Sequence, residues 1–405
     1  MSESRNFKTF KEELHKKHPV LFGVVVELPI VLFISIACTL LDMTGFFKSV
    51  EDPVLDSNLR LHPMRIERTV LVDIDDDSYA QLFKSTSPLK AEAVDALLEQ
   101  VTKANVPLVV VDIDTSDISF QALRHRKYHG RRIIWAQDVL TKRQPTKLGK
   151  RQRLDLIAGG VLGGSPDSSI ESGLAVMTLD RDGVVRGYPS KLEVTESAHS
   201  ANVVEKVTLP WMAISAIEGT KKDPEDELAR FNLMVDPETY DDLSAKEFFL
   251  KGDDAREFAK SWNEAADGKI VLVGGTYAEA RDRVLTPIGY VDGVKVIGLA
   301  IESQLQKTAV HLPKHFLMFL ADILCGIIFA AIAHAISKGR MVITTILMPI
   351  LAWSFSFIVF QLFSLWVDFI PVLFGVYLHM LHGHVHHHAK LVEELEKLRG
   401  TSKTI

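Results

Sequence analysis

The chain has 405 residues, a formal net charge of −6 and a sequence pI near 6.2. This length allows two or three domains with full cores, and the acidic balance argues against nucleic acid as a partner, which usually requires a basic surface. The hydrophobic fraction of 47% is ordinary as an average. The apolar residues gather at the two ends of the chain, however, and this predicts membrane segments flanking a soluble domain.

The N-terminal segment predicts a membrane anchor. Residues 1–19 form a basic tail, and residues 20–43 (VLFGVVVELPIVLFISIACTLLDM) are long and apolar enough to cross a bilayer as a helix. A cleaved signal peptide would have a shorter apolar core and a small-residue cleavage site, so we expect an uncleaved anchor. Basic residues before the span favour a cytoplasmic N-terminus. Residues 44–312 are therefore predicted to be extracytoplasmic.

The pattern of this middle segment predicts an α/β fold. Two nearly continuous apolar runs, Thr69–Ile74 and Val106–Ile113, are typical of strands buried on both faces of a parallel sheet. Ser78–Ala104 has helical spacing between them. Further strands are expected at Arg132–Gln137 and Lys269–Val273, and Val291–Gln304 reads as a strand or turn that passes into a helix. The expected architecture is a mainly parallel sheet with flanking helices.

Carboxylates follow both early strands. Asp73 and Asp75 end the first run, and Asp112 and Asp114 end the second. Aspartate is favoured at helix caps and turns, which is one interpretation. The other is ligand binding at the carboxyl edge of the sheet, where a divalent cation would suit several convergent carboxylates if the two strands are neighbours.

Two further motifs bear on this edge. LDRDGVVRGYP (179–189) predicts a hairpin turning at Asp182-Gly183, and its Arg186 either is solvated, pairs with the acidic edge or receives an anion. Gly274-Gly275 follow the strand at Lys269–Val273 but lack the nucleotide fingerprints, so we expect a strand-to-helix turn. Thr276 remains a candidate to contact a small extracellular ligand.

Three apolar stretches near the C-terminus, at 315–336, 341–363 and 365–381, predict three more spans and a helical membrane region of four in total. Basic residues at 338 and 340 and in the segment 382–405 favour the cytoplasm, so both termini are expected there. Glu27 and Asp322 lie within spans, where ionisable groups usually face other helices. We interpret them as packing residues, with transport as the alternative.

The segment 382–405 is expected to be a helical cytoplasmic tail rich in histidine. His382 with His386, and His384 with His388, are spaced four residues apart, which would allow a helix to chelate zinc. The alternative is that these side chains simply lie in the headgroup layer.

Four segments in order resemble the type-2 CHASE (CHASE2) domain, an extracytoplasmic sensor module of bacterial receptors. They are VLVDIDDDSY (70–79), VVVDID (109–114), LDRDGVVRGYP (179–189) and KIVLVGGTYAEARDRVLTPIGYVDGVKVIGLAIES (269–303), the last including Asp282. The resemblance implies one anchor before the domain and three spans after it, in the bacterial inner membrane. Two features depart from it: RHRKYHGRR (124–132) is short and basic, and about twenty residues follow the last span where relatives carry an output domain.

These observations favour a receptor subunit that detects an extracytoplasmic signal and relays it through the helices to a separate cytoplasmic output protein. Homo-oligomerisation is expected. The alternative is an oligomeric membrane effector or scaffold, such as a pore-forming or defence-associated protein. We expect no enzymatic activity, because no nucleophile–base pair and no catalytic metal spacing stand out in the middle segment. No cofactor is expected beyond the divalent cation or zinc named above.

Overall fold

The computed structural model describes residues 18–61, 63–115, 117–137, 139–142, 155–158, 170–195, 203–219, 228–232, 235, 242–313, 315–335, 338–378, 380–381 and 392. The chain forms two compact units. One, the sheet domain, comprises Leu59–Val310, and the other, the helical unit, comprises Met1–Asn58 with His311–Ile405.

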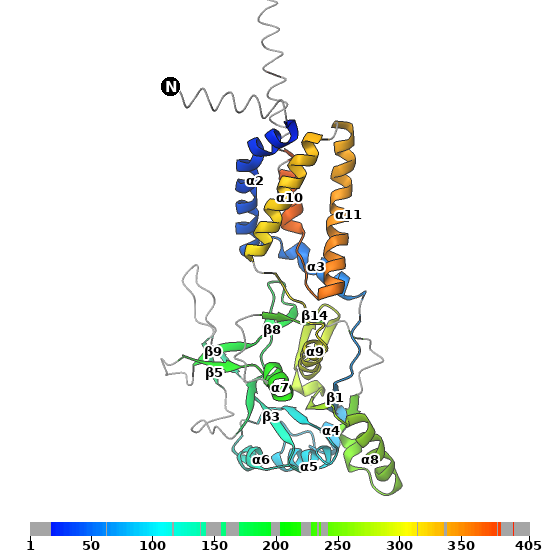
Figure 1. Cartoon of the computed structure of the whole chain (residues 1–405). Helices are drawn as coiled ribbons and strands as arrows, with labels where there is room; N and C mark the ends of the chain where they lie inside the picture. Colours follow the sequence, from blue (N-terminus) through cyan, green and yellow to red (C-terminus); the bar gives the residue numbers. More distant parts are fainter. Residues whose placement is uncertain are drawn as a thin grey trace, which may run out of the picture. The chain divides into compact units, whose positions relative to one another are not determined.

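The sheet domain is built on six parallel strands in the order β12-β1-β13-β2-β3-β6 (Figure 1). The expected α/β class and parallel sheet are confirmed, because every neighbouring pair in this sheet is parallel. The strands are β1 (Thr69–Ile74), β2 (Leu108–Asp112), β3 (Arg132–Gln137), β6 (Ser172–Leu174), β12 (Asp242–Ser244) and β13 (Ile270–Gly275).

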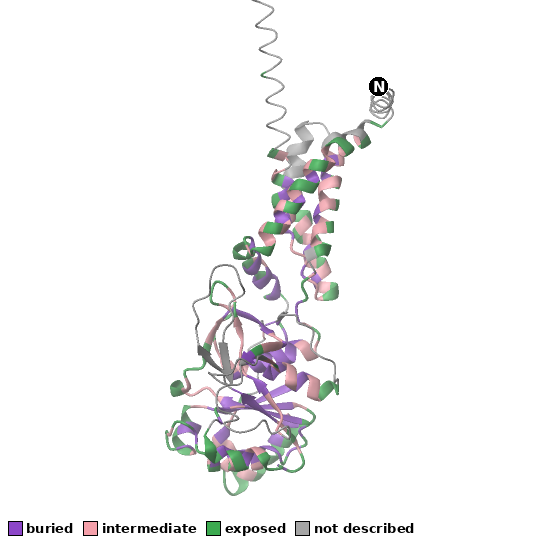
Figure 2. Ribbon diagram, turned by 90° about the vertical axis from the view of Figure 1, so that its left-hand side faces the viewer, coloured by how far each residue is buried: buried purple, intermediate pink, exposed green. Residues whose placement is uncertain are grey.

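Helices cover both faces of this sheet, which explains why its strands are apolar without alternation. Val70 and Val72 of β1 enter one core, and Leu71 enters the other. Figure 2 shows the central strands as buried. One face carries α4 (Asp76–Gln81), α5 (Ala91–Val101), α6 (Gln121–His125) and α8 (Asp253–Ala266), and the other carries α7 (Leu209–Glu218) and α9 (Gly293–Leu305).

Two expectations about this domain are corrected. The helical pattern over Ser78–Ala104 belongs to two helices, α4 and α5, rather than to one continuous helix. The two strands with acidic ends, β1 and β2, are not neighbours, because β13 lies between them and pairs with both. The condition on which a shared cation site at Asp73 and Asp112 depended is therefore not met.

Smaller sheets complete the domain. The predicted hairpin is confirmed: β7 (Thr178–Leu179) and β8 (Val185–Pro189) are antiparallel, and Gly183 in the turn has a φ of 79°, which favours glycine. The other elements are β11 (Leu228–Arg230) beside β8; the sheet of β4 (Val139–Lys142), β5 (Asp155–Ala158), β9 (Lys191–Thr195) and β10 (Val203–Val207); the pair β14 (Arg283–Thr286) and β15 (Gly289–Asp292); and three 3₁₀ turns, Ile118–Phe120, Ala245–Phe249 and Ala278–Ala280.

A buried carboxylate joins α9 to the start of β1. The Glu302 side chain has no exposed surface. It accepts hydrogen bonds from the backbone N–H groups of Glu67 (3.0 Å) and Arg68 (2.9 Å) and from the Thr69 hydroxyl (2.8 Å). Because a buried charge requires such donors, this contact fixes the first residues of β1 against α9.

The helical unit contains α2 (Pro19–Met43), α3 (Lys48–Leu59), α10 (His315–Ala335) and α11 (Lys338–Phe363), and residues 370–378 are also helical. Within the described ranges, Val24–Met43 is long and apolar enough to cross a membrane, whereas Phe316–Ile332 and Leu347–Phe363 are shorter apolar stretches. One membrane anchor near the N-terminus is thus supported. The helix α3 was not predicted, and residues 44–58 belong to this unit rather than to the sheet domain.

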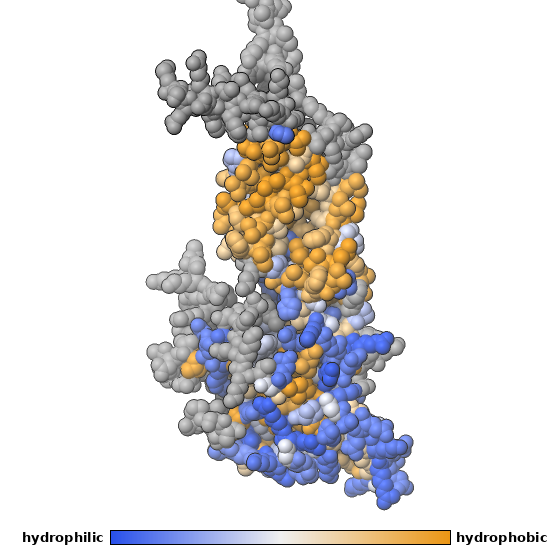
Figure 3. All heavy atoms as spheres, in the orientation of Figure 1, coloured by the Kyte–Doolittle hydropathy of each residue, from blue (hydrophilic) through white to orange (hydrophobic). Residues whose placement is uncertain are grey.

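The outer surface of these helices is apolar, as the orange region of Figure 3 shows. Phe33 of α2 is 73% exposed, Phe316 of α10 is 67% exposed and Leu362 of α11 is 68% exposed. Between the helices, Gly326 lies so close to Val31 that an added Cβ would be 2.6 Å from the valine Cγ1. A small residue at this position therefore allows α2 and α10 to pack closely.

The two polar residues expected inside spans differ in burial. Glu27 of α2 is partly exposed and has an interaction partner. Asp322 of α10 is 6% exposed and hydrogen-bonds with Ser35 of α2, which agrees with a packing role. A cavity of about 10 Å³ beside it has room for roughly one water molecule.

Candidate functional site

At the carboxyl edge of the sheet, the connections that follow β1 and β13 leave to opposite faces. After β1 the chain continues into α4 and α5 on one face, whereas after β13 it continues through β14 and β15 to α9 on the other face. Adjacent strands whose connections leave to opposite faces create a crevice at their carboxyl ends, and this is where open α/β sheets usually bind ligands. In register, Asp73 pairs with Gly274, which also pairs with Asp112.

Gly274 and Gly275 are the last residues of β13, and the chain does not pass directly from them into a helix. The two glycines thus belong to the strand, and Thr276 and Tyr277 lead from it into the 3₁₀ turn Ala278–Ala280 rather than into an α-helix. A Cβ on Gly274 would lie 2.5 Å from Cγ2 of Val294, and a Cβ on Gly275 would lie 2.5 Å from Cε1 of Tyr277. The glycines thus allow the first turn of α9 and the tyrosine ring to approach the strand closely.

Asp73 and Thr276 form the centre of the edge. The Thr276 hydroxyl lies 2.8 Å from both carboxylate oxygens of Asp73 and donates to them, so the side chains of β1 and of the segment after β13 are joined. Asp73 is 9% exposed. Burial raises the pKa of Asp73 to about 6, and the Thr276 hydrogen bond opposes this rise. A carboxyl with such a pKa changes charge near physiological pH, which is common at functional sites.

A second charged pair lies beside this centre. Lys295 in the first turns of α9 forms an ion pair with Asp242 at the start of β12. Asp242 raises the pKa of Asp73 and Lys295 lowers it, so both charges act on the buried carboxyl. Sequence reasoning missed this pair. The available signal was the position of Lys295, three residues after the Asp292 that precedes α9.

The other aspartates after β1 have structural partners. Asp75 caps α4 by accepting from the Ser78 N–H at 2.7 Å, and it also accepts from the Ser244 hydroxyl at 2.7 Å. Although burial acts to raise it, these hydrogen bonds lower the pKa of Asp75. Asp76 accepts from the Ala278 N–H at 2.8 Å. For these two residues the capping and turn interpretation is supported.

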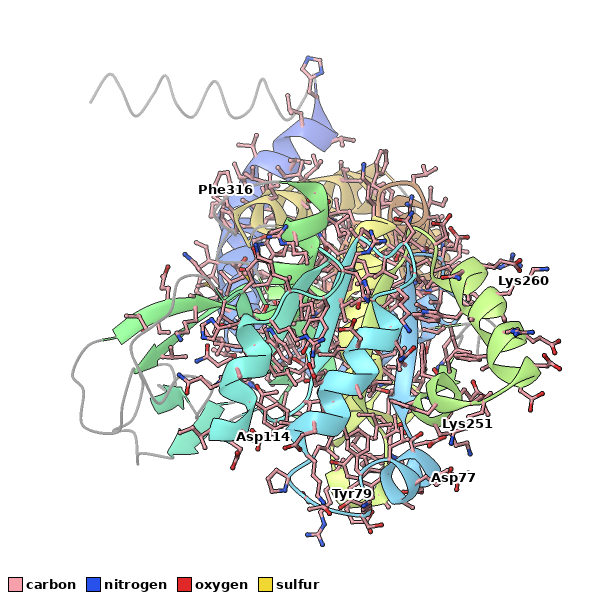
Figure 4. All side chains as sticks on the ribbon, turned by 90° about the horizontal axis from the view of Figure 1, so that it is seen from below. Asp77, Tyr79, Asp114, Lys251, Lys260 and Phe316 are labelled. Atoms are coloured by element: carbon pink, nitrogen blue, oxygen red, sulfur yellow. The ribbon has the colours of Figure 1, made fainter. Side chains whose placement is uncertain are left out.

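Two aromatic rings close one side of the edge. Tyr79 of α4 and Tyr277 are stacked, with ring centroids 4.2 Å apart and planes inclined by 11°. Figure 4 labels Asp77, Tyr79 and Asp114 along the lower rim of the view, where α4 and the end of β2 lie. Asp114 is exposed and acts electrostatically on Tyr277. The edge therefore combines an acidic rim with a tyrosine pair that packs into the core of the domain.

Three other predicted residues have partners or neighbours outside the Asp73–Thr276 contact. Asp112 is separated from Asp73 by β13, which places their backbones roughly 10 Å apart, two strand spacings. Arg186 is 7% exposed and forms ion pairs with Asp180 (3.1 Å) and Asp182 (2.9 Å) of its own hairpin. The Asp282 carboxylate lies against Gly293, where α9 begins.

The predicted zinc ligands His382, His384, His386 and His388 lie outside the described residues.

Comparison with known proteins adds one finding. The family model of the CHASE2 domain matches residues 31–336, three quarters of the chain. No curated protein and no solved structure matches the chain.

Proposed function

The chain belongs to the CHASE2 family, whose domain is an extracytoplasmic sensor, and we propose that it is a membrane-anchored receptor subunit. In this proposal a small ligand binds at the carboxyl edge of the sheet beside β13. The signal then passes through the helical unit to a cytoplasmic output partner. The Asp73–Thr276 contact at the point where the strand connections reverse is the observation that supports a ligand site most directly.

We propose that four helices cross the bacterial inner membrane. The support is the apolar outer surface of α2, α10 and α11. Exposed apolar residues that continue over several helices are unfavourable in water and are normally covered by lipid or protein. Basic residues before the first helix, in the first turn of α11 and after residue 381 favour the cytoplasmic side. Both termini would then be cytoplasmic and the sheet domain extracytoplasmic.

Cysteine labelling tests this arrangement. Lys260 is exposed on α8, and we expect Lys260→Cys to react with a membrane-impermeant maleimide in spheroplasts, whose inner membrane is intact. Lys397→Cys in the C-terminal tail should react only after the inner membrane is permeabilised. Labelling of the unsubstituted chain, which has Cys38 and Cys325, gives the background. Equal labelling of the two variants before permeabilisation would contradict the topology.

The charges at the edge indicate the class of ligand. The edge carries four carboxylates, those of Asp73, Asp76, Asp77 and Asp114. The lysine side chains beside them form ion pairs with Asp77 and Asp242. An acidic rim favours a cationic or hydroxyl-rich ligand, since carboxylates attract cations and accept hydrogen bonds from hydroxyl groups. We therefore propose an organic amine or a polyol rather than an anion.

The path of the signal would follow α9. In the first turn of α9, Val294 packs against Gly274 of β13, and the charge of Lys295 lowers the pKa of Asp73. At its other end Glu302 holds the start of β1. The chain then reaches the first residue of α10, His315, within ten residues of Leu305. A ligand that displaces the first turn of α9 would thus move a helix covalently linked to the helical unit.

A thermal-shift screen of the full chain in detergent tests the ligand site. Amines, polyols, amino acids and short peptides are the probes, and a binding ligand at about 100 times its Kd should raise Tm by several degrees. Thr276→Val keeps the side-chain shape but removes the hydroxyl, so we expect it to abolish the shift. Glu264→Gln, an exposed change on α8, should keep it. A shift that Thr276→Val leaves intact would place the ligand elsewhere.

The alternative of a pore-forming effector has less support. The cavity beside Asp322 has room for only about one water molecule, so it does not by itself favour a conducting path.

A further inference from the structure

Three carboxylates meet in the helical unit. Asp42 lies in the last turn of α2, Glu51 lies in the first turn of α3, and Asp368 lies between α11 and the helix at 370–378. One oxygen from each lies within 4.8 Å of the others. Segments from three parts of the unit thus bring three carboxyl groups to one point.

The Glu51 side chain gives a second observation at this cluster. It is only 7% exposed, and its Oε1 has no hydrogen-bond partner among the residues that the structure describes. A buried acceptor without a partner is costly, and natural structures usually satisfy it with a protein group, water or ion. Its carboxyl is also hydrogen-bonded with that of Asp368. Two carboxyls can share such a bond only when one carries a proton, unless a cation takes the proton's place.

The surrounding charges make a cation favourable. Asp52, 7% exposed, adds a fourth negative charge that acts on Glu51. Like charges at this spacing repel strongly where water is largely excluded. A divalent cation would replace this repulsion with attraction and would give Glu51 Oε1 a partner.

From this geometry we propose that Asp42, Glu51 and Asp368 form a calcium site. The donors are all carboxylate oxygens, which hard cations prefer. Ca–O distances of about 2.3–2.6 Å allow ligand oxygens to lie up to about 5 Å apart, so the limit of 4.8 Å between these oxygens is within the span of a calcium shell. A magnesium shell, with distances near 2.1 Å, spans only about 4.2 Å and would require pairs near the upper limit to contract.

Such an ion would connect three parts of the helical unit. Asp42 ends the helix that begins the unit, and Asp368 precedes the last helix, whose Ile370 N–H donates to Asp368 Oδ1 at 3.0 Å. The segment of Asp368 is itself held by backbone hydrogen bonds between His311 and residues 364 and 366. In the proposed topology all these residues lie at the extracytoplasmic end of the helices, so calcium outside the cell would stabilise their packing.

Equilibrium binding of radioactive calcium to the full chain in detergent tests the site. We expect saturable binding of about one ion per chain, with a Kd on the order of 10⁻⁴–10⁻³ M, as in extracellular calcium modules. Glu51→Gln and Asp368→Asn should each weaken binding at least about tenfold, because each removes a charged ligand. Glu264→Gln, which removes an exposed carboxylate on α8, should leave the Kd unchanged.

Thermal unfolding distinguishes calcium from protons. Calcium should raise the Tm of the unsubstituted chain by a few degrees over the value in EDTA, and magnesium should do so less. Glu51→Gln should be more stable than the unsubstituted chain in EDTA and should not respond to calcium. No saturable binding up to about 10 mM, tenfold above the expected Kd, or binding unchanged in Glu51→Gln, would overturn the proposal. These outcomes do not depend on whether the sheet edge binds a ligand.

Discussion

Replacing Glu302 with alanine is expected to lower the free energy of unfolding of the sheet domain by about 3–5 kcal/mol. The carboxylate is completely buried, and it accepts hydrogen bonds from the backbone of Glu67 and Arg68 and from the Thr69 hydroxyl. Alanine would leave these donors, of which Thr69 is buried, without their acceptor and would also open a cavity. Because the donors begin β1, the change should loosen the strand that carries Asp73.

Denaturant unfolding of the full chain, combined with hydrogen exchange of the amides of β1, measures this loss. Glu302→Gln keeps the shape and one acceptor oxygen, so its cost should be smaller, about 1–3 kcal/mol. The exposed control Glu264→Gln should change stability by less than about 0.5 kcal/mol. If Glu302→Ala unfolds at the denaturant concentration of the unsubstituted chain, the proposed role of this carboxylate is wrong.

Asp73→Asn should have the opposite effect on stability and a large effect on sensing. Burial raises the pKa of Asp73 from 3.8 to about 6, so the native state favours the neutral carboxyl. The stabilisation that this gives is fully present below pH 3.8 and is lost as the pH rises through about 6. At about pH 7.5 asparagine should therefore stabilise the domain by about 2 kcal/mol, with allowance for water at the edge.

The comparison needs two pH values and one matched variant. At about pH 7.5 the Tm of Asp73→Asn should exceed that of the unsubstituted chain by several degrees, and at about pH 4 the difference should nearly vanish. Asp114→Asn, an exposed change at the same edge, should alter Tm little at either pH. The stabilised Asp73→Asn should no longer respond to the ligand, a trade of function for stability. If Asp73→Asn is less stable than the unsubstituted chain at about pH 7.5, the charged Asp73 carboxylate does not destabilise the native state as proposed.

Local pattern was sufficient for the elements that are buried on both sides or turn sharply. Thr69–Ile74 and Arg132–Gln137 were predicted with the bounds that the structure shows, because a strand between two helical layers has no polar face. The hairpin at Asp182-Gly183 followed from turn chemistry. The quoted motifs also sufficed for the CHASE2 assignment, which the family model bears out.

The site needed contacts that no local pattern contains. Sequence reasoning placed Asp73 and Thr276 at the same edge, but their hydrogen bond depends on β13 lying beside β1. It considered a cation between Asp73 and Asp112, whose strands are separated by β13.

The sequence by itself determined the α/β class, the N-terminal anchor and the acidic strand ends, because burial and turn formation leave their mark on neighbouring residues. Only the tertiary structure decided the order of the strands, the hydrogen bonds that join Glu302 to the start of β1, and the proximity of Asp42, Glu51 and Asp368. Strand order and carboxylate clusters arise from pairings between residues that are distant in the chain. The energy of such a pairing depends on which surfaces meet. The residues next to each partner in the sequence therefore do not reveal it.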